Sequence, residues 1–258
     1  MSTTSTRVAI ITGGAQGIGE AIALRLADED INVVIFDVKG KESLLESLVK
    51  KIEAKGRKAF YVVGDVTNEA DIKGAVDKTV ETFGGLDIMV ANAGILFMKP
   101  ITECTPEDFN RVLGVNTLGV MLAFKHAAQQ MIKQGRGGRI IGASSLSGKQ
   151  GMADVSLYCA SKFAVRGMTQ ATALELQKHN ITVNSYAPGL ILTPMVVHPD
   201  DDKHGGLGSV VLMNPALKPG TKGATPSVVA ELVAYLIKPE AHFVTGQTIT
   251  IDGGQYFD

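Results

Sequence analysis

The chain lacks several features that mark specialised proteins. It has only two cysteines, Cys104 and Cys159, too few for a disulfide framework, so we predict a reducing compartment, most simply the cytoplasm. The formal net charge of −1 leaves no basic excess for nucleic acid. No apolar run approaches the roughly 20 residues that cross a bilayer. The polar opening of the chain has no apolar segment like that of a secretory signal, so we expect no leader and no membrane partner.

What is present fits one large α/β domain. The 258 residues are 45% hydrophobic and 20% charged, as in ordinary globular proteins, and they contain no internal repeat or low-complexity segment. Composition shifts only across residues 194–223, which hold prolines, paired glycines and an aspartate run. Long irregular insertions in compact domains are often functional. Because only about 35 residues follow, too few for a domain, we predict a single domain over 1–258 with a mobile substrate lid at 194–223.

Short apolar runs alternate with longer amphipathic stretches. This alternation predicts βαβ units, and continuous apolar runs are typical of buried parallel strands. We therefore expect a doubly wound parallel sheet of about seven strands with helices on both faces. The expected strands are Val8–Thr12, Asn32–Asp37, Ala59–Val63, Ile88–Ala91, Arg139–Ala143, Thr182–Ala187 and Thr248–Ile251. The expected helices are Gly17–Asp28, Lys41–Ala54, Glu69–Phe83, Thr105–Gln134 (whole, or broken near Asn116), Val155–His179 and Pro226–Leu236.

A glycine-rich turn lies between the first expected strand and the first expected helix. Its glycines, from Gly13 to Gly19, let backbone N–H groups approach a pyrophosphate, which a helix N-terminus also attracts. Asp37 ends the next strand, where a carboxylate can accept hydrogen bonds from an adenosine ribose and would repel a 2′-phosphate. Gln16 is neutral, and Lys39 is the one residue here that would favour NADP(H). The pattern favours NAD(H) over NADP(H).

Tyr158 and Lys162 stand four residues apart on an expected helix and so share one face. A positive charge close to a phenol favours the phenolate and lowers the tyrosine pKa from its ordinary value of about 10. Tyr158 is therefore a candidate general acid or base. Such a pair is common on helix surfaces, so by itself it is weak evidence for catalysis and needs support from other motifs in the chain.

Taken in order, these motifs resemble the short-chain dehydrogenase/reductase family almost end to end, and the resemblance implies a single-domain Rossmann fold. The chain carries the glycine motif, an Asp-Val pair, Asn-Ala-Gly, a helix asparagine, the serine, the tyrosine and lysine, Pro-Gly with a following threonine, and a late Asp-Gly-Gly. These motifs are Thr12–Gly19, Asp65-Val66, Asn92-Ala93-Gly94, Asn116, Ser145, Tyr158 with Lys162, Pro188-Gly189 with Thr193, and Asp252-Gly253-Gly254. Ala91 departs from the family, which often has a second asparagine there.

The resemblance implies a role for each residue. Tyr158 would exchange a proton with the substrate oxygen, Lys162 would stabilise the phenolate and hold the nicotinamide ribose, Ser145 would position the substrate, and Asn116 would hold a relay water. Ser144 is the alternative serine, and purely structural roles are the alternatives for Asn116 and Ser145. The implied cofactor contacts are Gly13, Gln16, Gly17, Ile18, Gly19, Asp37, Asp65, Val66, Asn92, Ala93, Gly94, Tyr158, Lys162, Pro188, Gly189, Ile191 and Thr193.

The expected substrate pocket is mostly apolar and suits a neutral ketone or secondary alcohol. It comprises Ser145, Ser147, Gln150, Met152, Leu190 and Met195, further walled by Leu146, Val155, Leu96 and Phe97. Within the family the stretches around Tyr158 and Pro188 look most like acetoin/diacetyl reductases, that is, 2,3-butanediol dehydrogenases. A bulkier cyclic or terpenoid alcohol stays open because of the unusual composition of 194–223.

Two functional alternatives come from other classes. A catalytically silent dinucleotide-binding regulator would have no reason to keep Asn116, Ser145, Tyr158 and Lys162 together, and an acyl-carrier-protein ketoreductase would carry basic residues in the cofactor turn. The five histidines lack metal-ligand spacing, so we expect no metal. Asp200, Asp201 and Asp202 are expected to form a solvated acidic run. The resemblance also implies a homodimer or homotetramer assembled through the two longest helices.

Overall fold

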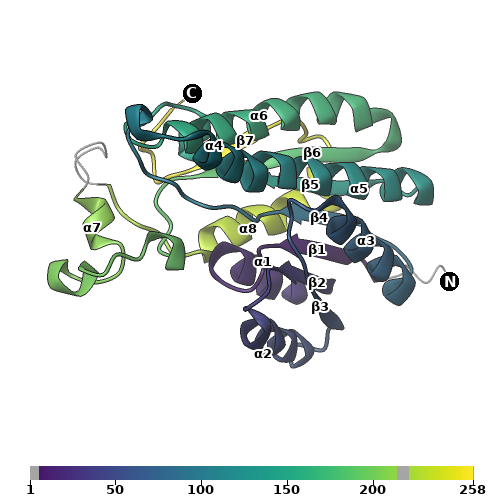
Figure 1. The fold of residues 1–258 in the computed structure, drawn as a ribbon. Helices are drawn as coiled ribbons and strands as arrows, with labels where there is room; N and C mark the ends of the chain where they lie inside the picture. The colour runs from purple at the N-terminus through teal and green to yellow at the C-terminus, as the bar shows by residue number, and fades with distance from the viewer. Residues whose placement is uncertain (1–5, 214–220, 258) are drawn as a thin grey trace.

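Seven parallel strands form one sheet in the order β3-β2-β1-β4-β5-β6-β7. The computed structural model, shown in Figure 1, describes residues 6–213 and 221–257. The strands are β1 Val8–Thr12, β2 Asn32–Asp37, β3 Ala59–Val63, β4 Ile88–Ala91, β5 Gly138–Ala143, β6 Ile181–Pro188 and β7 Thr248–Ile251. The strand order reverses between β1 and β4, where doubly wound sheets bind ligands at the carboxyl ends of their strands. The predicted fold class is confirmed.

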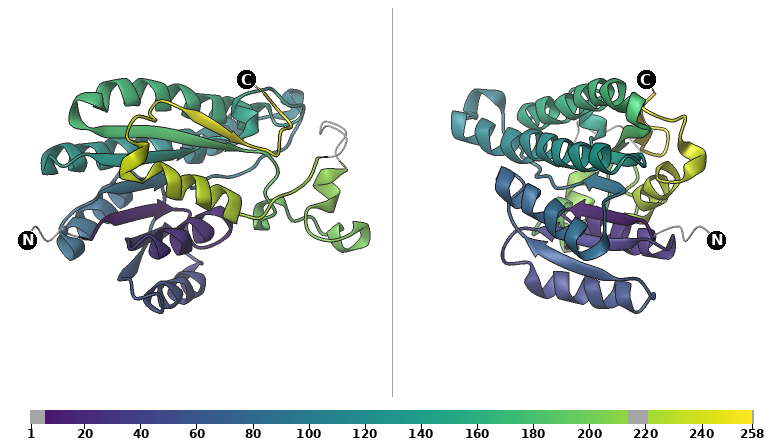
Figure 2. Two further views of the ribbon diagram at one scale, coloured as in Figure 1. Left: turned by 180° about the vertical axis from the view of Figure 1, so that it is seen from behind. Right: turned by 90° about the vertical axis from the view of Figure 1, so that its right-hand side faces the viewer.

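Helices cover both faces of the sheet, as the right-hand view of Figure 2 shows. Alternate residues of a strand point to opposite faces. In β1, Ala9 and Ile11 accordingly join the core beneath one helical layer, and Ile10 joins the core beneath the other. The first layer holds α1 Gly17–Asp28, α2 Glu42–Glu53 and α8 Ser227–Leu236, and the second holds α3 Glu69–Phe83, α5 Gly119–Gln134 and α6 Ser156–Leu176.

The long helical stretch predicted at 105–134 consists of three consecutive helical elements. Thr105 and Asp108 form a capping box that starts α4 Pro106–Leu113, and a π-helical turn, Gly114–Leu118, joins α4 to α5. Gly119 permits close packing at this junction, because a Cβ there would lie 2.7 Å from a methyl carbon of Val66. Residues 106–134 are thus helical without interruption, and the irregularity near Asn116 is a π turn and not a break. Such turns occur often at functional sites.

The described residues 194–213 project from the body near α7 at the left of Figure 1. They contain the 3₁₀ turns Pro194–Val196 and Asp201–His204 and the short α7 Ser209–Leu212. Part of the predicted lid, residues 214–220, lies outside the described residues. Within the described parts of the chain, no helix combines the length and the apolar character needed to span a membrane.

Candidate active site

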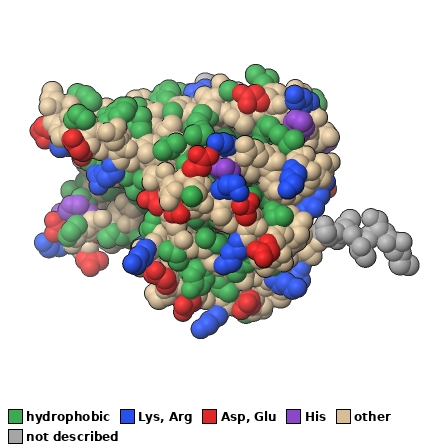
Figure 3. All heavy atoms as spheres, turned by 45° about the vertical axis from the view of Figure 1, so that its right-hand side comes forward, with side chains coloured by type: hydrophobic (Ala, Val, Ile, Leu, Met, Phe, Trp, Pro, Cys, Tyr) green, Lys and Arg blue, Asp and Glu red, His purple; other side chains and the backbone are tan. Residues whose placement is uncertain are grey.

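A cleft of about 190 Å³ opens at the carboxyl ends of β1, β4, β5 and β6. Figure 3 shows a hollow at its left side, where the segment after β6 projects from the body. Many of the residues predicted from the sequence line this cleft together. They are Gly13, Gln16, Gly17, Ile18, Asp37, Asn92, Ala93, Gly94, Tyr158, Lys162, Pro188, Thr193 and Met195. The lining also includes Lys41, Ala143, Ser144, Tyr186 and Pro194, and of these only Ser144 had been a candidate.

The glycine-rich turn is shaped to receive an anionic group. Gly17 has a φ of 62°, in the left-handed region that side chains disfavour, and a Cβ there would lie 3.3 Å from Thr193. Gln16 is the N-cap of α1 and makes no side-chain cap hydrogen bond, so it leaves the first-turn N–H groups to other acceptors. A Cβ on Gly19 would overlap the carbonyl oxygen of Gly13. This cradle fits the pyrophosphate of a dinucleotide.

Asp37 lies beside this turn at the end of β2. One carboxylate oxygen accepts a hydrogen bond from the Ala15 N–H at 2.9 Å, and the other accepts from the Val38 N–H at 2.8 Å. Lys41, not Lys39, brings a cation to the cleft, and its Nζ donates to Gln16 Oε1 at 3.1 Å. The sequence pointed to Lys39, which lies two residues after the end of the strand. The turn after β2 instead brings Lys41 back toward the cleft.

Asn92 ties three parts of the site together. Its Nδ2 donates to the carbonyl oxygens of Thr12 and Gly13, both at 2.9 Å, and its Oδ1 accepts from the Tyr186 hydroxyl at 2.8 Å. Tyr186 is only 1% exposed, and its burial raises the pKa of its hydroxyl far above the ordinary value. The Asn92 amide therefore supports the glycine turn from beneath. No feature of the sequence singled out Tyr186, because its partner lies 94 residues away.

Asn116 and Lys162 meet across Gly94. The fully buried Asn116 accepts from the Ile95 N–H at 2.8 Å and donates to the Ile95 carbonyl at 3.0 Å and to Ser161 Oγ at 3.1 Å. Lys162 Nζ donates to the Ala143 carbonyl at 2.8 Å. A Cβ on Gly94 would lie 3.3 Å from both Asn116 Oδ1 and Lys162 Nζ. The site therefore needs the open space that glycine leaves here.

Tyr158 and Ser145 form a hydroxyl pair. Burial raises the pKa of Tyr158, while a hydrogen bond with Ser145 opposes that rise. This is opposite to the direction expected from the sequence. Lys162 Nζ lies 5.5 Å from the centre of the Tyr158 ring and is itself buried, which lowers the pKa of Lys162 to about 8. Tyr158 is thus held as a neutral phenol, the form that can donate a proton.

The two neighbouring serines have different partners. Ser144 is buried, and its hydroxyl donates to the Lys162 backbone carbonyl at 3.1 Å. Ser145 caps the 3₁₀ turn Leu146–Gly148, accepting from the Ser147 N–H at 3.1 Å, and its hydroxyl lies beside that of Tyr158. Ser144 lines the cleft and Ser145 does not, whereas only Ser145 pairs with the Tyr158 hydroxyl, so the choice of Ser145 as the substrate-facing serine stays a prediction.

Other predicted residues lie away from this cleft. Val66 is buried in the core with Phe36 and Leu122, and Asp65 accepts from the N–H and hydroxyl of Thr67. Leu190 lines a separate, larger cavity of about 620 Å³ next to the C-terminal tail. In the expected substrate pocket, Ser147 Oγ donates to Met152 Sδ at 3.2 Å. Gly189, Ile191 and Gln150 are absent from the cleft lining as well.

A comparison with family models matches residues 7–204 to the short chain dehydrogenases. The chain belongs to this family. A short-chain dehydrogenase/reductase of Armillaria gallica is 47% identical over 254 residues, covering 98% of this chain and 97% of the relative. An L-2,3-butanediol dehydrogenase of Corynebacterium glutamicum is 37% identical (98% and 99% covered), and an (S)-acetoin-forming diacetyl reductase of Staphylococcus aureus is 38% identical (98% and 99% covered).

Solved structures agree with this membership. A short chain dehydrogenase from Mycobacterium paratuberculosis bound to NAD matches with a TM-score of 0.86 and 34% identity, over 96% of this chain and 97% of that one. An acetoin dehydrogenase from Salmonella typhimurium matches with a TM-score of 0.85 and 33% identity, over 97% and 96%. This short-chain dehydrogenase is an oxidoreductase that interconverts a secondary alcohol and a ketone with a nicotinamide dinucleotide.

Proposed function

We propose that this short-chain dehydrogenase interconverts diacetyl, acetoin and 2,3-butanediol, using NAD(H). The observation that carries the chemistry is the Tyr158–Ser145 hydroxyl pair, because Tyr158 lines the same cleft as Lys162 and the glycine-rich turn. The choice of a small hydroxyketone draws on relatives at 37–38% identity whose names specify such substrates.

In this proposal each catalytic side chain has a distinct task. Tyr158, kept neutral by burial, donates its proton to the ketone oxygen, and Ser145 donates a hydrogen bond to the same oxygen. Lys162 holds a positive charge close to the phenolate that remains, while Asn116 fixes the backbone at Ile95 through its N–H and carbonyl groups. When bound, the dinucleotide supplies the hydride. In the direction of alcohol oxidation, the Tyr158 phenolate accepts the proton of the alcohol hydroxyl.

We propose that the enzyme prefers NAD(H) to NADP(H) because the Asp37 carboxylate lines the cleft beside the glycine-rich turn, where it would hold an adenosine ribose. A 2′-phosphate there would face like charge. Lys41 lies on the same side of the cleft and could neutralise a phosphate once Asp37 is removed. We expect Asp37→Ser to raise kcat/KM for NADPH relative to NADH by about tenfold or more, a gain that adding Lys41→Ala should abolish. If wild type already favours NADPH, this account of Asp37 is wrong.

Measuring the loss of NADH absorbance against a ketone panel tests the proposed function. The panel holds diacetyl, acetoin, cyclic diketones and terpenoid ketones. Tyr158→Phe is expected to lower the rate by about 10²–10⁴-fold. Tyr235→Phe, an exposed tyrosine on α8, is the matched control and should leave the rate unchanged. Turnover that survives Tyr158→Phe would contradict the assignment of the proton donor.

A bulkier cyclic or terpenoid alcohol is the second candidate substrate. The relative that shares 47% identity has a name that specifies no substrate, so this higher similarity does not favour small diols. A catalytic efficiency for a cyclic ketone at least tenfold above that for diacetyl would replace the first proposal. Tight NADH binding without turnover of any ketone would instead favour the silent regulator.

We also propose a cytoplasmic homodimer or homotetramer. Apolar side chains stand exposed on α4, α5 and α6, among them Phe109, Met121 and Phe163, and a second copy could cover them. Cys104 and Cys159 are free thiols, as suits a reducing compartment. Light scattering should find two or four chains, and Phe163→Glu should reduce that number. A monomeric wild type would contradict the proposed assembly, and a fluorescent fusion tests the compartment.

A further inference from the structure

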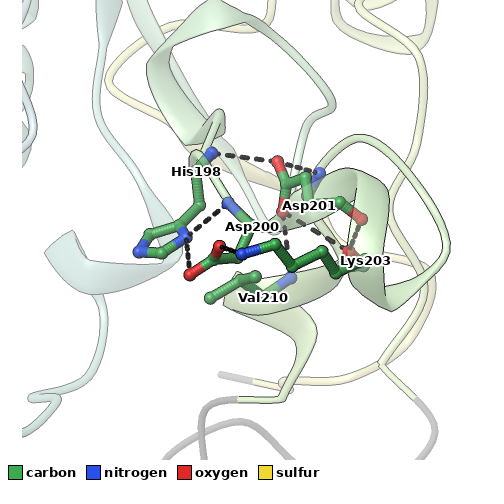
Figure 4. A network of polar contacts seen from close by, with 7 residues as sticks. His198, Asp200, Asp201, Lys203 and Val210 are labelled. Atoms are coloured by element: carbon green, nitrogen blue, oxygen red, sulfur yellow. Dashed lines mark hydrogen bonds and ion pairs between the residues drawn. The ribbon is translucent and has the colours of Figure 1, made fainter.

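The aspartate run at 200–202 does not form the solvated acidic face that its sequence predicts. Asp200 and Asp202 are exposed or partly so, but Asp201 is only 4% exposed. It lies at the centre of the segment that projects beyond β6, as Figure 4 shows. An aspartate is seldom buried unless its oxygens are fully engaged.

Backbone N–H groups engage both carboxylate oxygens of Asp201. Oδ2 accepts from the N–H groups of His198 and Gly208, both at 2.9 Å, and Oδ1 accepts from the Val210 N–H at 3.0 Å. Ser209 Oγ donates to the Asp201 carbonyl at 2.9 Å. These bonds, with that of His198 as the largest cause, lower the pKa of Asp201 to about 2, so the carboxylate stays ionised at neutral pH. One side chain thus closes residues 198–210, here named the Asp201 loop.

The neighbouring charged side chains pair with Asp200, and backbone N–H groups bind the Asp201 carboxylate. Lys203 pairs with Asp200 at 2.6 Å, and the Asp200 N–H donates to His198 Nδ1 at 3.2 Å, both outside the cluster of N–H groups (Figure 4). A metal ion would need the same oxygen lone pairs that the three N–H groups occupy. The Asp201 carboxylate therefore joins two parts of its own chain by hydrogen bonds and does not form a metal site.

The Asp201 loop contacts the cofactor turn through a short chain of residues. Gly208 has a φ of 78°, and a Cβ there would lie 2.8 Å from Leu192 Cδ2, so the loop packs directly on Leu192. Thr193 follows Leu192 and packs against Gly17 of the glycine-rich turn, where a Cβ would lie 3.3 Å away. A shift of the loop would therefore move the side of the cleft that Thr193 lines.

We propose that Asp201 is a positioning residue, whose carboxylate folds the Asp201 loop and thereby holds Leu192 and Thr193 against the glycine-rich turn. The inference rests on the proposed function for its kinetic consequence. Tyr158 and Lys162 lie on α6, and Ser145 caps the 3₁₀ turn after β5, so none of these groups belongs to the Asp201 loop. We therefore expect binding to change more than catalysis. Loss of Asp201 should raise KM for the ketone and the Kd for NADH, and change kcat little.

The test compares Asp201→Ala and Asp201→Asn with Asp202→Ala, which removes the same charge from an exposed neighbour. Hydrogen exchange of a peptide spanning 206–212 reports the loop directly. We expect Asp201→Ala to speed that exchange, and to raise both KM for diacetyl and Kd for NADH, by about tenfold each, while kcat stays within about threefold. Asp202→Ala should match wild type in every readout.

Asp201→Asn sharpens the result, because its amide keeps one acceptor oxygen and turns an N–H₂ group toward former donors. An effect between those of wild type and Asp201→Ala is expected. Unchanged exchange in Asp201→Ala would show that the carboxylate does not hold the loop. Faster exchange with KM and Kd equal to those of Asp202→Ala would show that the loop does not reach the site. If wild type reduces no ketone, the proposed function fails, and exchange and NADH affinity still decide this inference.

Discussion

Replacing Tyr186 by Phe tests whether the buried bridge to Asn92 supports the site. The change removes one hydroxyl that is essentially inaccessible to solvent and leaves Asn92 Oδ1 without its 2.8 Å donor. An unsatisfied buried acceptor costs about 1–3 kcal/mol. For a chain of this size each kcal/mol lowers the melting temperature by roughly 2–4 °C, so a fall of about 2–12 °C is expected.

The matched control is Tyr235→Phe, which removes the same hydroxyl from a half-exposed position on α8 and should stay within about 0.5 kcal/mol of wild type. Thermal and urea unfolding of both variants give the comparison. If Tyr186→Phe is as neutral as Tyr235→Phe, the bridge contributes nothing measurable and the reasoning fails.

Asn92→Asp separates the bridge from the support of the turn. A carboxylate would place oxygen opposite the Thr12 and Gly13 carbonyls, where the amide now donates twice at 2.9 Å. NADH affinity should fall by about tenfold or more in Asn92→Asp, whereas Tyr186→Phe leaves both donors in place and should stay within about threefold. Equal NADH affinities in the two variants would show that Asn92 does not shape the cofactor turn.

Two further predictions concern burial and space. Burial lowers the pKa of Lys162 from its ordinary 10.5 to about 8 in the folded state. Between these two values the unfolded state binds more protons than the folded state, so the free energy of unfolding should rise with pH. Relative to Lys162→Met, the rise should be on the order of 3 kcal/mol. Urea unfolding of both proteins from pH 7 to 10.5 checks the sign, and a flat difference would contradict it. Gly19→Ala should abolish NADH binding, measured by titration, because its Cβ would overlap the Gly13 carbonyl oxygen. Gly74→Ala, where α3 leaves open space for a Cβ, should instead stabilise the folded protein by about 0.5–1 kcal/mol, measured by thermal melting.

The sheet was predictable because its signals are local. Continuous apolar runs such as β1 and glycine–acid spacing such as that from the turn to Asp37 lie within about 30 residues, and each matched its element within a few residues at either end. A break near Asn116 was foreseen as an alternative, but the structure has a π turn within a continuous helix, followed by close packing between Gly119 and Val66, which no sequence periodicity reports.

The candidate site was less predictable where long-range packing decides the outcome. Tyr186 and Lys41 reach the cleft only through the fold, and the pKa of Tyr158 rises because the effect of burial exceeds that of the hydrogen bond with Ser145. Asp201 looks like one of three equivalent acids in the sequence, yet the turn at Gly208 brings N–H groups onto it alone. The sequence shows that all three aspartates could be solvated, but the backbone geometry of the loop decides that Asp201 is buried.

The π turn at Gly114–Leu118 amounts to one extra residue held within an otherwise regular helix. Deleting Thr117 from it would let the helix continue with 3.6 residues per turn and would rotate everything before it, Asn116 included, by about 100° relative to α5. The Asn116 amide would then turn away from Ile95, although every side chain used in the site would still be encoded. Length is therefore constrained at this turn more tightly than residue type, and a change in the number of residues here should be more damaging than most substitutions.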